Sequence, residues 1–123
     1  MKEVSAKVFR FGAYSYAISS TLLRPFIGKG LYAFMKDKEI VYSLDAPSLP
    51  VVSSPNTAFS SDVAFNQKII LLKNNSPVVI IPKLFARKLG IQIGSRVALS
   101  VDRKKFKIKK LKKYSEKSTF SSS

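Results

Sequence analysis

Residues Ser76–Ile108 read SPVVIIPKLFARKLGIQIGSRVALSVDRKKFKI, and this stretch decides the fold. Val78–Ile81 is a run of β-branched apolar residues, which suits a buried strand. Pro82 lacks a backbone N–H and has a fixed φ, so it ends that strand and can serve as the first residue of a helix. The apolar residues of Lys83–Leu89 fall on one side of a short helix, which Gly90 can end in the left-handed conformation.

The rest of the stretch combines the alternation of strands with the polar residues of turns. Ile91–Ile93 alternates, Gly94-Ser95 supplies a turn, and Val97–Val101 alternates again. Asp102–Lys104 is a polar hairpin tip, and Phe106–Ile108 carries the returning strand. The pattern therefore predicts a strand, a short helix and a terminal hairpin.

This ordered set resembles the AbrB/SpoVT family of small prokaryotic DNA-binding modules, also called the MazE-like or swapped-hairpin family. The resemblance covers about one third of the chain directly. It implies that one unit does not bury its own apolar face, and that two units interleave strands to close one small β-barrel, normally as a homodimer. The matching residues are Ile81, Pro82, Leu84, Arg87, Leu89, Gly90, Ile91, Ile93, Gly94, Val97, Leu99 and Val101.

The first 44 residues follow the same plan in a degenerate form. Ile18-Ser19 aligns with Ile81-Pro82, and Gly30 aligns with Gly94, with one residue fewer in the first half. The hydroxyls of Ser19–Thr21 can cap a helix start, but Pro25 lies inside that helix and would break it. The alternative is that this half is an unrelated β-meander.

We therefore expect a mostly β protein, an AbrB-like swapped-hairpin barrel built from two tandem copies with one short helix each. Two copies in one chain can close the barrel as a monomeric pseudo-dimer, and a homodimer of tandem chains is the alternative. The connector is apolar enough to lie partly against the barrel. The expected divisions are a degenerate copy at 1–44, a Pro/Ser-rich connector at 45–65, an AbrB-like copy at 66–112 and a disordered basic, Ser-rich tail at 113–123.

Charge points to a polyanionic partner. The chain has 22 Lys plus Arg against 7 Asp plus Glu, a net charge of +15. Residues 66–123 carry fifteen of the basic side chains and two of the acidic ones. This balance favours nucleic acid first and an anionic membrane surface second.

Composition also excludes several kinds of chemistry. Because the chain has no Cys and no His, it has no disulfide, thiolate zinc site, Cys nucleophile or His acid–base pair. No apolar run approaches the roughly 20 residues of a membrane span. We expect no enzymatic activity, no cofactor, no metal and no membrane partner, and a cytoplasmic, nucleoid-associated protein.

The family resemblance implies that nucleic acid is contacted by the turn between the first two strands and by the short helix. Arg offers a planar fork to phosphates or guanine edges, Lys a point charge, and Asn both donates and accepts at base edges. For any one Lys, the alternative is a solvated surface charge. Arg87 is the strongest candidate because Pro82 and Gly90 hold its helix. The candidates are Lys73, Asn74, Asn75, Lys83, Arg87 and Lys88 in the second copy and Arg10, Tyr14, Arg24 and Lys29 in the first.

Two further surfaces leave alternatives open. Lys105, Lys107 and Lys109 share one face of the last strand if Phe106 and Ile108 face the core. This face is either a second electrostatic footprint or a basic edge that discourages sheet pairing. The aromatic residues of the first half are expected to fill the barrel, although a base-stacking platform is the alternative.

The sequence thus predicts a double-stranded DNA-binding protein, a transcriptional regulator of archaeal or prokaryotic AbrB type. One alternative is a non-specific, chromatin-type DNA binder, and another is RNA or protein binding on the same barrel. A third is the antitoxin of a toxin–antitoxin pair. That role usually needs an acidic C-terminal arm, whereas Glu116 is the single acid of a basic tail, so a toxin partner is not expected.

Overall fold

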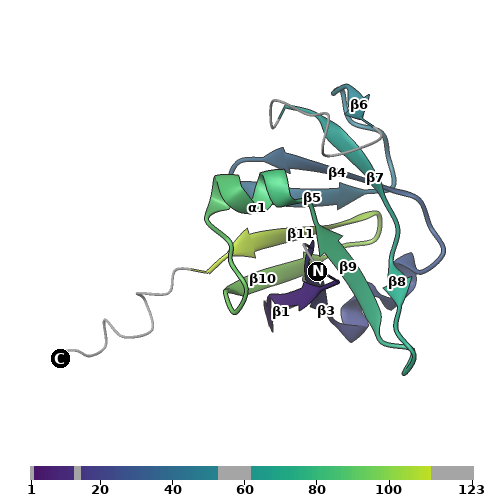
Figure 1. Cartoon of the computed structure of the whole chain (residues 1–123). Helices are drawn as coiled ribbons and strands as arrows, with labels where there is room; N and C mark the ends of the chain where they lie inside the picture. Colours follow the sequence, from purple (N-terminus) through teal and green to yellow (C-terminus); the bar gives the residue numbers. More distant parts are fainter. Residues whose placement is uncertain (1, 13–14, 53–61, 112–123) are drawn as a thin grey trace.

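The computed structural model describes residues 2–12, 15–52 and 62–111, and the expected mostly β fold is confirmed (Figure 1). The first half contains β1 (Lys2–Lys7), β2 (Phe9–Phe11), β3 (Ser15–Ser19), the 3-10 helix η1 (Thr21–Phe26), β4 (Leu31–Lys36) and β5 (Glu39–Ser43). The second half contains β6 (Val51–Val52), β7 (Ala64–Gln67), β8 (Ile70–Leu71), β9 (Pro77–Ile81), α1 (Lys83–Leu89), β10 (Arg96–Val101) and β11 (Lys105–Lys110).

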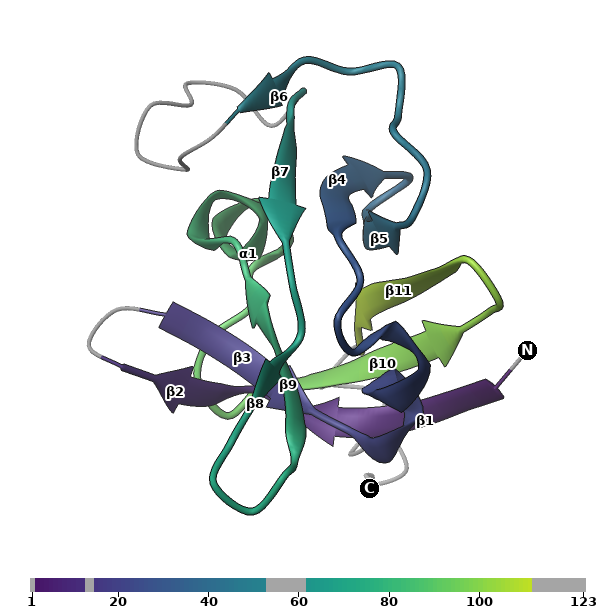
Figure 2. The ribbon, with the colours of Figure 1, turned by 90° about the vertical axis from the view of Figure 1, so that its right-hand side faces the viewer.

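The strands form two open sheets. The seven-stranded sheet has the order β1-β10-β11-β5-β4-β7-β6, and the four-stranded sheet has the order β2-β3-β9-β8. The chain passes from one sheet to the other four times: directly from β1 into β2 and from β7 into β8, and through the helices from β3 to β4 and from β9 to β10 (Figure 2). The two sheets are therefore tied together by four continuous stretches of chain, two of which contain the helices.

Strand pairing joins the two halves of the chain in both sheets. β1 pairs with β10, and β7 pairs with β4, so one strand of each half lies beside a hairpin of the other half. β3 pairs with β9 in one sheet, and β5 pairs with β11 in the other, all antiparallel. Neither half has a sheet of its own, and each completes the sheets of the other.

The alternation predicted for the last strand is confirmed. Phe106 and Ile108 are fully buried, while Lys105 and Lys109 are exposed on the opposite face and Lys107 is half-exposed beside Glu39, 3.7 Å from its carboxylate. The basic-edge interpretation of these lysines is wrong, because β11 lies between β10 and β5 inside the sheet.

The second-half helix begins and ends where the sequence predicts. α1 spans Lys83–Leu89, and Gly90 closes it with a φ of 71°. Pro82 is the residue before the first helical one, with a φ of −55° and a ψ of 131°, rather than the first residue of the helix. Phe85 and Ala86 are fully buried and fix the helix on the core.

Residues 91–95 form a turn and not the alternating strand segment that the sequence suggests. The Gln92 N–H donates to Ser95 Oγ at 2.9 Å, and the Ser95 N–H donates to the Gln92 carbonyl at 2.9 Å. Ile91 is buried, whereas Ile93 is 48% exposed. The two isoleucines therefore do not line one buried face.

The short helix of the first half is a 3-10 helix. Pro25 lies inside it, and the predicted capping is confirmed because Ser20 Oγ accepts a hydrogen bond from the Leu22 N–H at 3.2 Å. Proline cannot donate an i→i−4 bond, so the tighter geometry suits this sequence. Leu23 and Phe26 are buried and anchor the helix.

The connector packs partly against the sheet, as expected. β6 pairs in parallel with β7, and Val52 and Val63 pack against the core. Ala64 and Phe65 are already buried strand residues. Residues 13–14, 53–61 and 112–123 lie outside the described residues, so the predictions for Ala13, Tyr14, the middle of the connector and the tail are not addressed.

An aromatic cluster in the core packs η1 against the seven-stranded sheet. Phe26 and Tyr42 contact Phe106, with ring centroids 5.0 and 4.6 Å apart. The Tyr42 hydroxyl donates to the Ile80 carbonyl at 2.7 Å and so connects β5 to β9 across the interior. Burial raises the pKa of Tyr42, which keeps the hydroxyl protonated and able to donate.

We predict that Tyr42→Phe lowers the free energy of unfolding by about 1–3 kcal/mol, because it leaves the Ile80 carbonyl without its donor in the interior. Tyr32→Phe is the matched control, since Tyr32 is half-buried and its hydroxyl has no hydrogen-bond partner among the described residues. Urea unfolding followed by circular dichroism measures both. Equal losses for the two variants would contradict the role of this hydrogen bond.

Candidate nucleic-acid interface

The turn between β8 and β9 presents three predicted residues to solvent. Lys73, Asn74 and Asn75 are all exposed. Asn75 has a φ of 64°, as predicted for an Asn turn. Asn74 Oδ1 accepts a hydrogen bond from the Ser76 N–H at 3.1 Å, and the Ser76 carbonyl accepts from the Leu72 N–H at 3.0 Å. The backbone of this turn is therefore fixed by its own hydrogen bonds.

Arg24 brings a first-half residue to the same turn. Its Nη2 donates to the Asn75 carbonyl at 3.4 Å, while the side chain stays exposed. Close by, Ser19 Oγ donates to the Pro77 carbonyl at 2.8 Å. We call Arg24, Lys73, Asn74 and Asn75 the turn site. Lys29 follows η1 in an exposed loop.

A second group of predicted residues surrounds α1. Lys83, Arg87 and Lys88 are exposed on the helix, and Lys83 and Arg87 share a face because they are four residues apart. Arg10 is exposed on β2, opposite Tyr16, whose other neighbour is Ile81 at the end of β9. We call Arg10, Lys83, Arg87 and Lys88 the helix site.

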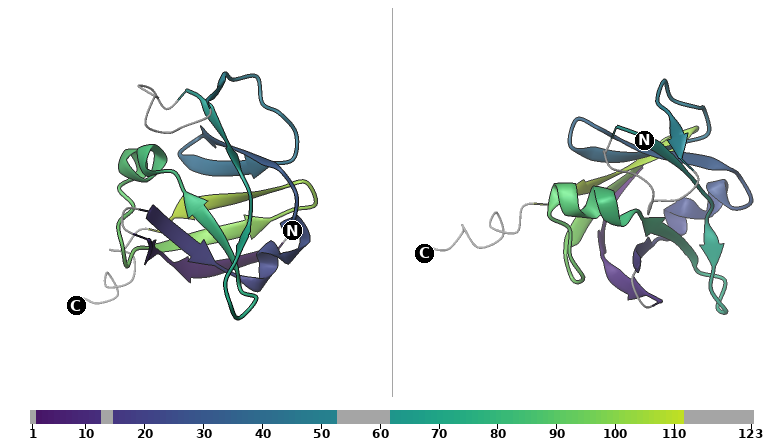
Figure 3. Two further views of the ribbon diagram at one scale, coloured as in Figure 1. Left: turned by 45° about the vertical axis from the view of Figure 1, so that its right-hand side comes forward. Right: turned by 45° about the horizontal axis from the view of Figure 1, so that its top comes forward.

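The two sites lie apart in the molecule. α1 and the β8–β9 turn occupy different ends in both views of Figure 3. Each site draws residues from both halves of the chain, because the strand exchange carries Arg24 to the β8–β9 turn and Arg10 to the strands beside α1. None of the described acidic residues belongs to η1, α1 or the β8–β9 turn.

Residues 2–12, 15–52 and 62–111 contain no group of three or more metal-ligating His, Cys, Asp or Glu side chains. Within the same residues, no helix has the length and apolarity needed to cross a bilayer.

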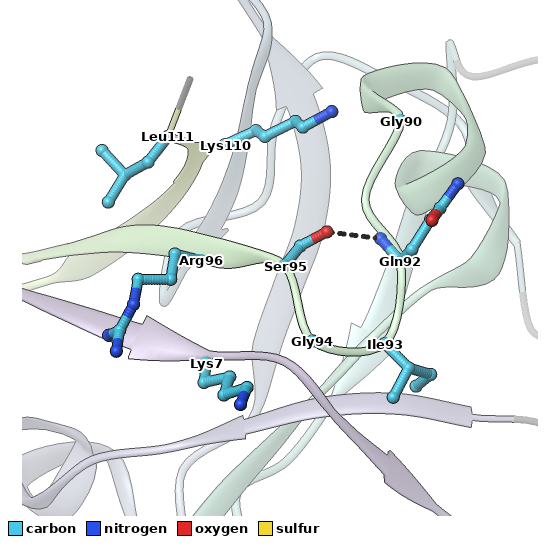
Figure 4. A pocket seen from close by; sticks show the side chains of 9 residues that line it. All are labelled: Lys7, Gly90, Gln92, Ile93, Gly94, Ser95, Arg96, Lys110 and Leu111. Atoms are coloured by element: carbon cyan, nitrogen blue, oxygen red, sulfur yellow. Dashed lines mark hydrogen bonds between the residues drawn. The ribbon is translucent and has the colours of Figure 1, made fainter. Parts of the chain in front are cut away.

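The sequence did not reveal one further basic group, which consists of Lys7, Arg96 and Lys110 around a hollow at the end of β10 (Figure 4). Lys7 and Arg96 are 89 positions apart in the chain and become neighbours only through the pairing of β1 with β10. Arg96 directly follows the Gly94-Ser95 turn, but nothing in that local pattern indicates a partner.

The fold and the two basic sites define the class of the protein: a small, mostly β module with cationic turn and helix surfaces. Residues 66–116 match the MazE_antitoxin family, described as antidote-toxin recognition MazE, bacterial antitoxin. This segment is therefore a MazE-type domain of the AbrB/MazE swapped-hairpin family, whose members are typically non-enzymatic and bind DNA. A search of curated proteins found no match, and a search of solved structures found none either.

We predict that Asn75→Ala lowers the free energy of unfolding by about 1 kcal/mol, whereas Asn75→Gly leaves it nearly unchanged, because Asn75 has a left-handed φ of 64°. Asn66 on β7 is the matched control. There the order reverses, because glycine weakens a strand more than alanine does. Urea unfolding of the four variants measures this, and the same order at both positions would contradict it.

Proposed function

We propose that this protein binds double-stranded DNA in the cytoplasm, on the nucleoid, and acts as a sequence-specific transcriptional regulator of prokaryotic AbrB type. One observation carries the proposal: the segment that matches the AbrB/MazE family holds its helix and first turn so that their basic and amide side chains are exposed. Arginine and asparagine can read base edges, and lysine can neutralise phosphates.

We propose further that the two halves are tandem copies that close one barrel within the chain. The pairing pattern supports this, because every antiparallel strand pair either has a counterpart in the other half or joins the two halves, and only the parallel β6–β7 pair has no counterpart among the described strands. β1 with β10 corresponds to β7 with β4, and the hairpin β4–β5 corresponds to β10–β11. The β3–β9 pair and the β5–β11 pair each join corresponding strands of the two copies, so a two-fold axis that relates the copies would pass through both pairs.

The hairpins also support a revised alignment of the copies. Asp37-Lys38 and Arg103-Lys104 are the central residues of the two hairpins, which gives an offset of 66. With this offset Gly28, rather than Gly30, corresponds to Gly94, and both have positive φ, 82° and 91°. The first copy then lacks about one helical turn between its helix start and this glycine, consistent with its shorter helix.

The two copies would contact a duplex unequally. The β8–β9 turn offers Lys73, Asn74 and Asn75, and it is tied to Arg24. The described part of the β2–β3 hairpin offers Arg10 as its exposed cation. Since the β8–β9 turn and the β2–β3 hairpin differ in the side chains that can read bases, we expect a DNA target whose two half-sites differ in sequence.

We predict that Arg87→Ala lowers the affinity for a selected duplex at least tenfold, because a guanidinium in a fixed helix loses its contact with a base or phosphate. Arg103→Ala is the matched control, since it removes the same charge from the β10–β11 tip. The duplex is obtained by selecting bound sequences from random DNA, and affinity is measured by fluorescence anisotropy across a salt series.

The same measurements distinguish a sequence-specific regulator from a non-specific, chromatin-type DNA binder. A selected sequence that binds much more tightly than random duplex supports a regulator, while equal binding indicates a chromatin-type binder. Equal losses for Arg87→Ala and Arg103→Ala would remove α1 from the interface.

The antitoxin role is the second candidate, and the description of the matched family favours it. It requires a toxin encoded beside this gene. If that role holds, co-expression of this chain restores growth to cells that make the neighbouring toxin.

We predict that the chain is monomeric, because strands from both halves already complete each other's sheets. The midpoint of urea unfolding should then not depend on protein concentration over a 100-fold range, and sedimentation should give a mass near 13.7 kDa. A midpoint that rises with concentration would instead indicate a homodimer of tandem chains.

A further inference from the structure

A hollow of about 540 Å³ lies at the end of β10, between the turn that follows α1 and the ends of β1 and β11 (Figure 4). Three cations from three strands line it, Lys7 on β1, Arg96 on β10 and Lys110 on β11. Its other lining residues are Gly90, Gln92, Ile93, Gly94, Ser95 and Leu111. None of the lining residues is acidic.

The positive charge at this hollow is not balanced within the described part of the chain. Lys7 and Arg96 are direct cross-strand partners, and like charges in that arrangement repel. Neither of them, nor Lys110, has an ion-pair partner among the described residues. Lys110 extends toward the end of α1, where a Cβ on Gly90 would lie 3.1 Å from its Nζ.

The fold itself does not require these cations. The corresponding corner at the other side, where β7 pairs with β4, has its own hollow of about 480 Å³. That hollow contains a single charged residue, Lys68, and its lining consists of Gly30, Leu31, Asn66, Gln67, Lys68 and Ile70. The same strand arrangement is therefore built with one cation on one side and with three on the other.

The frame around the cations is fixed by backbone hydrogen bonds. The Val8 N–H donates to the Ser95 carbonyl at 2.8 Å, and the Gly94 N–H donates to the Val8 carbonyl at 2.8 Å. These bonds hold the turn against the strand that carries Lys7. Gly94 has a φ of 91°, which a residue with a side chain rarely adopts. A ligand in the hollow would therefore meet a turn whose backbone is already in place.

We propose that this hollow is a phosphate-binding site, in which the Arg96 guanidinium supplies a planar fork with Lys7 as a point charge beside it on the same face of the sheet, and Lys110 supplies a second point charge from the α1 side. Its size accommodates a phosphate with the sugar attached to it. The phosphate comes either from the backbone of a bound nucleic acid or from a free phosphorylated ligand. Gly90 joins the hollow to α1, so a backbone could continue here from the helix site. Of these two sources of phosphate, only the nucleic-acid backbone rests on the proposed function.

The first arm of the test uses pyrophosphate and the full chain. Amide signals of Gln92, Gly94 and Ser95 are followed by NMR during titration at low salt, in the wild type, in Arg96→Gln and in Lys68→Gln. We expect saturable shifts in the wild type and in Lys68→Gln, and at least tenfold weaker binding in Arg96→Gln. Arg96 is exposed, and circular dichroism checks that the variant is folded.

The second arm measures duplex affinity against salt for the same three proteins. If the site binds a backbone phosphate, Arg96→Gln reduces the slope of log affinity against log salt by about 0.9, and Lys68→Gln does not change it. If the slope is unchanged while pyrophosphate binding is lost, the site serves a free phosphorylated ligand. If the wild type does not bind duplex DNA at all, the proposed function is contradicted, but the result of the pyrophosphate titration still stands.

Two results would overturn the proposed site. In the first, the amide shifts of the wild type do not saturate with pyrophosphate, and the slope of log duplex affinity against log salt is the same in all three proteins. The other is an equal effect of Arg96→Gln and Lys68→Gln in both arms, because general charge reduction would then explain the data.

Discussion

The antiparallel pairing of β3 with β9 is the contact on which the rest of the structure depends. Ile18 and Val79 are directly paired there, and both are fully buried. β3 leads into η1 and β9 leads into α1, so this one pair fixes the origin of both helices. At the other side of the core, β5 pairs with β11 and holds the hairpins together. Without these two pairs, each half would leave the apolar face of its strands in water, at a cost that grows with the exposed area.

Both candidate sites follow from that arrangement. The side chains that could meet nucleic acid come from short local elements, but their groupings do not. Arg24 reaches the carbonyl of Asn75, 51 positions along the chain, and Arg10 lies two strands from the end of β9. The hollow beside Arg96 has the same origin, since Lys7 arrives there through strand exchange. Non-local pairing thus decides which cations act together.

The sequence predicted the elements whose signals are local. Pro82 and Gly90 bracket α1, polar residues mark the tip at Arg103, and the lysines of β11 alternate with Phe106. It misread Ile91–Ile93, because two apolar residues with one between them occur in turns as well as in strands. Cross-strand neighbours such as Lys7 and Arg96 could not be predicted, since their register depends on a pairing between distant strands.

The β2–β3 hairpin and the β8–β9 turn are separate stretches of one polypeptide, and this has an evolutionary consequence. In an assembly of identical subunits, any codon change appears on both sides at once. Here a change in codon 74 or 75 affects one turn and leaves the other as it was. Selection can therefore adjust one side of the molecule without altering the opposite side, and the two surfaces are free to diverge under a shared scaffold.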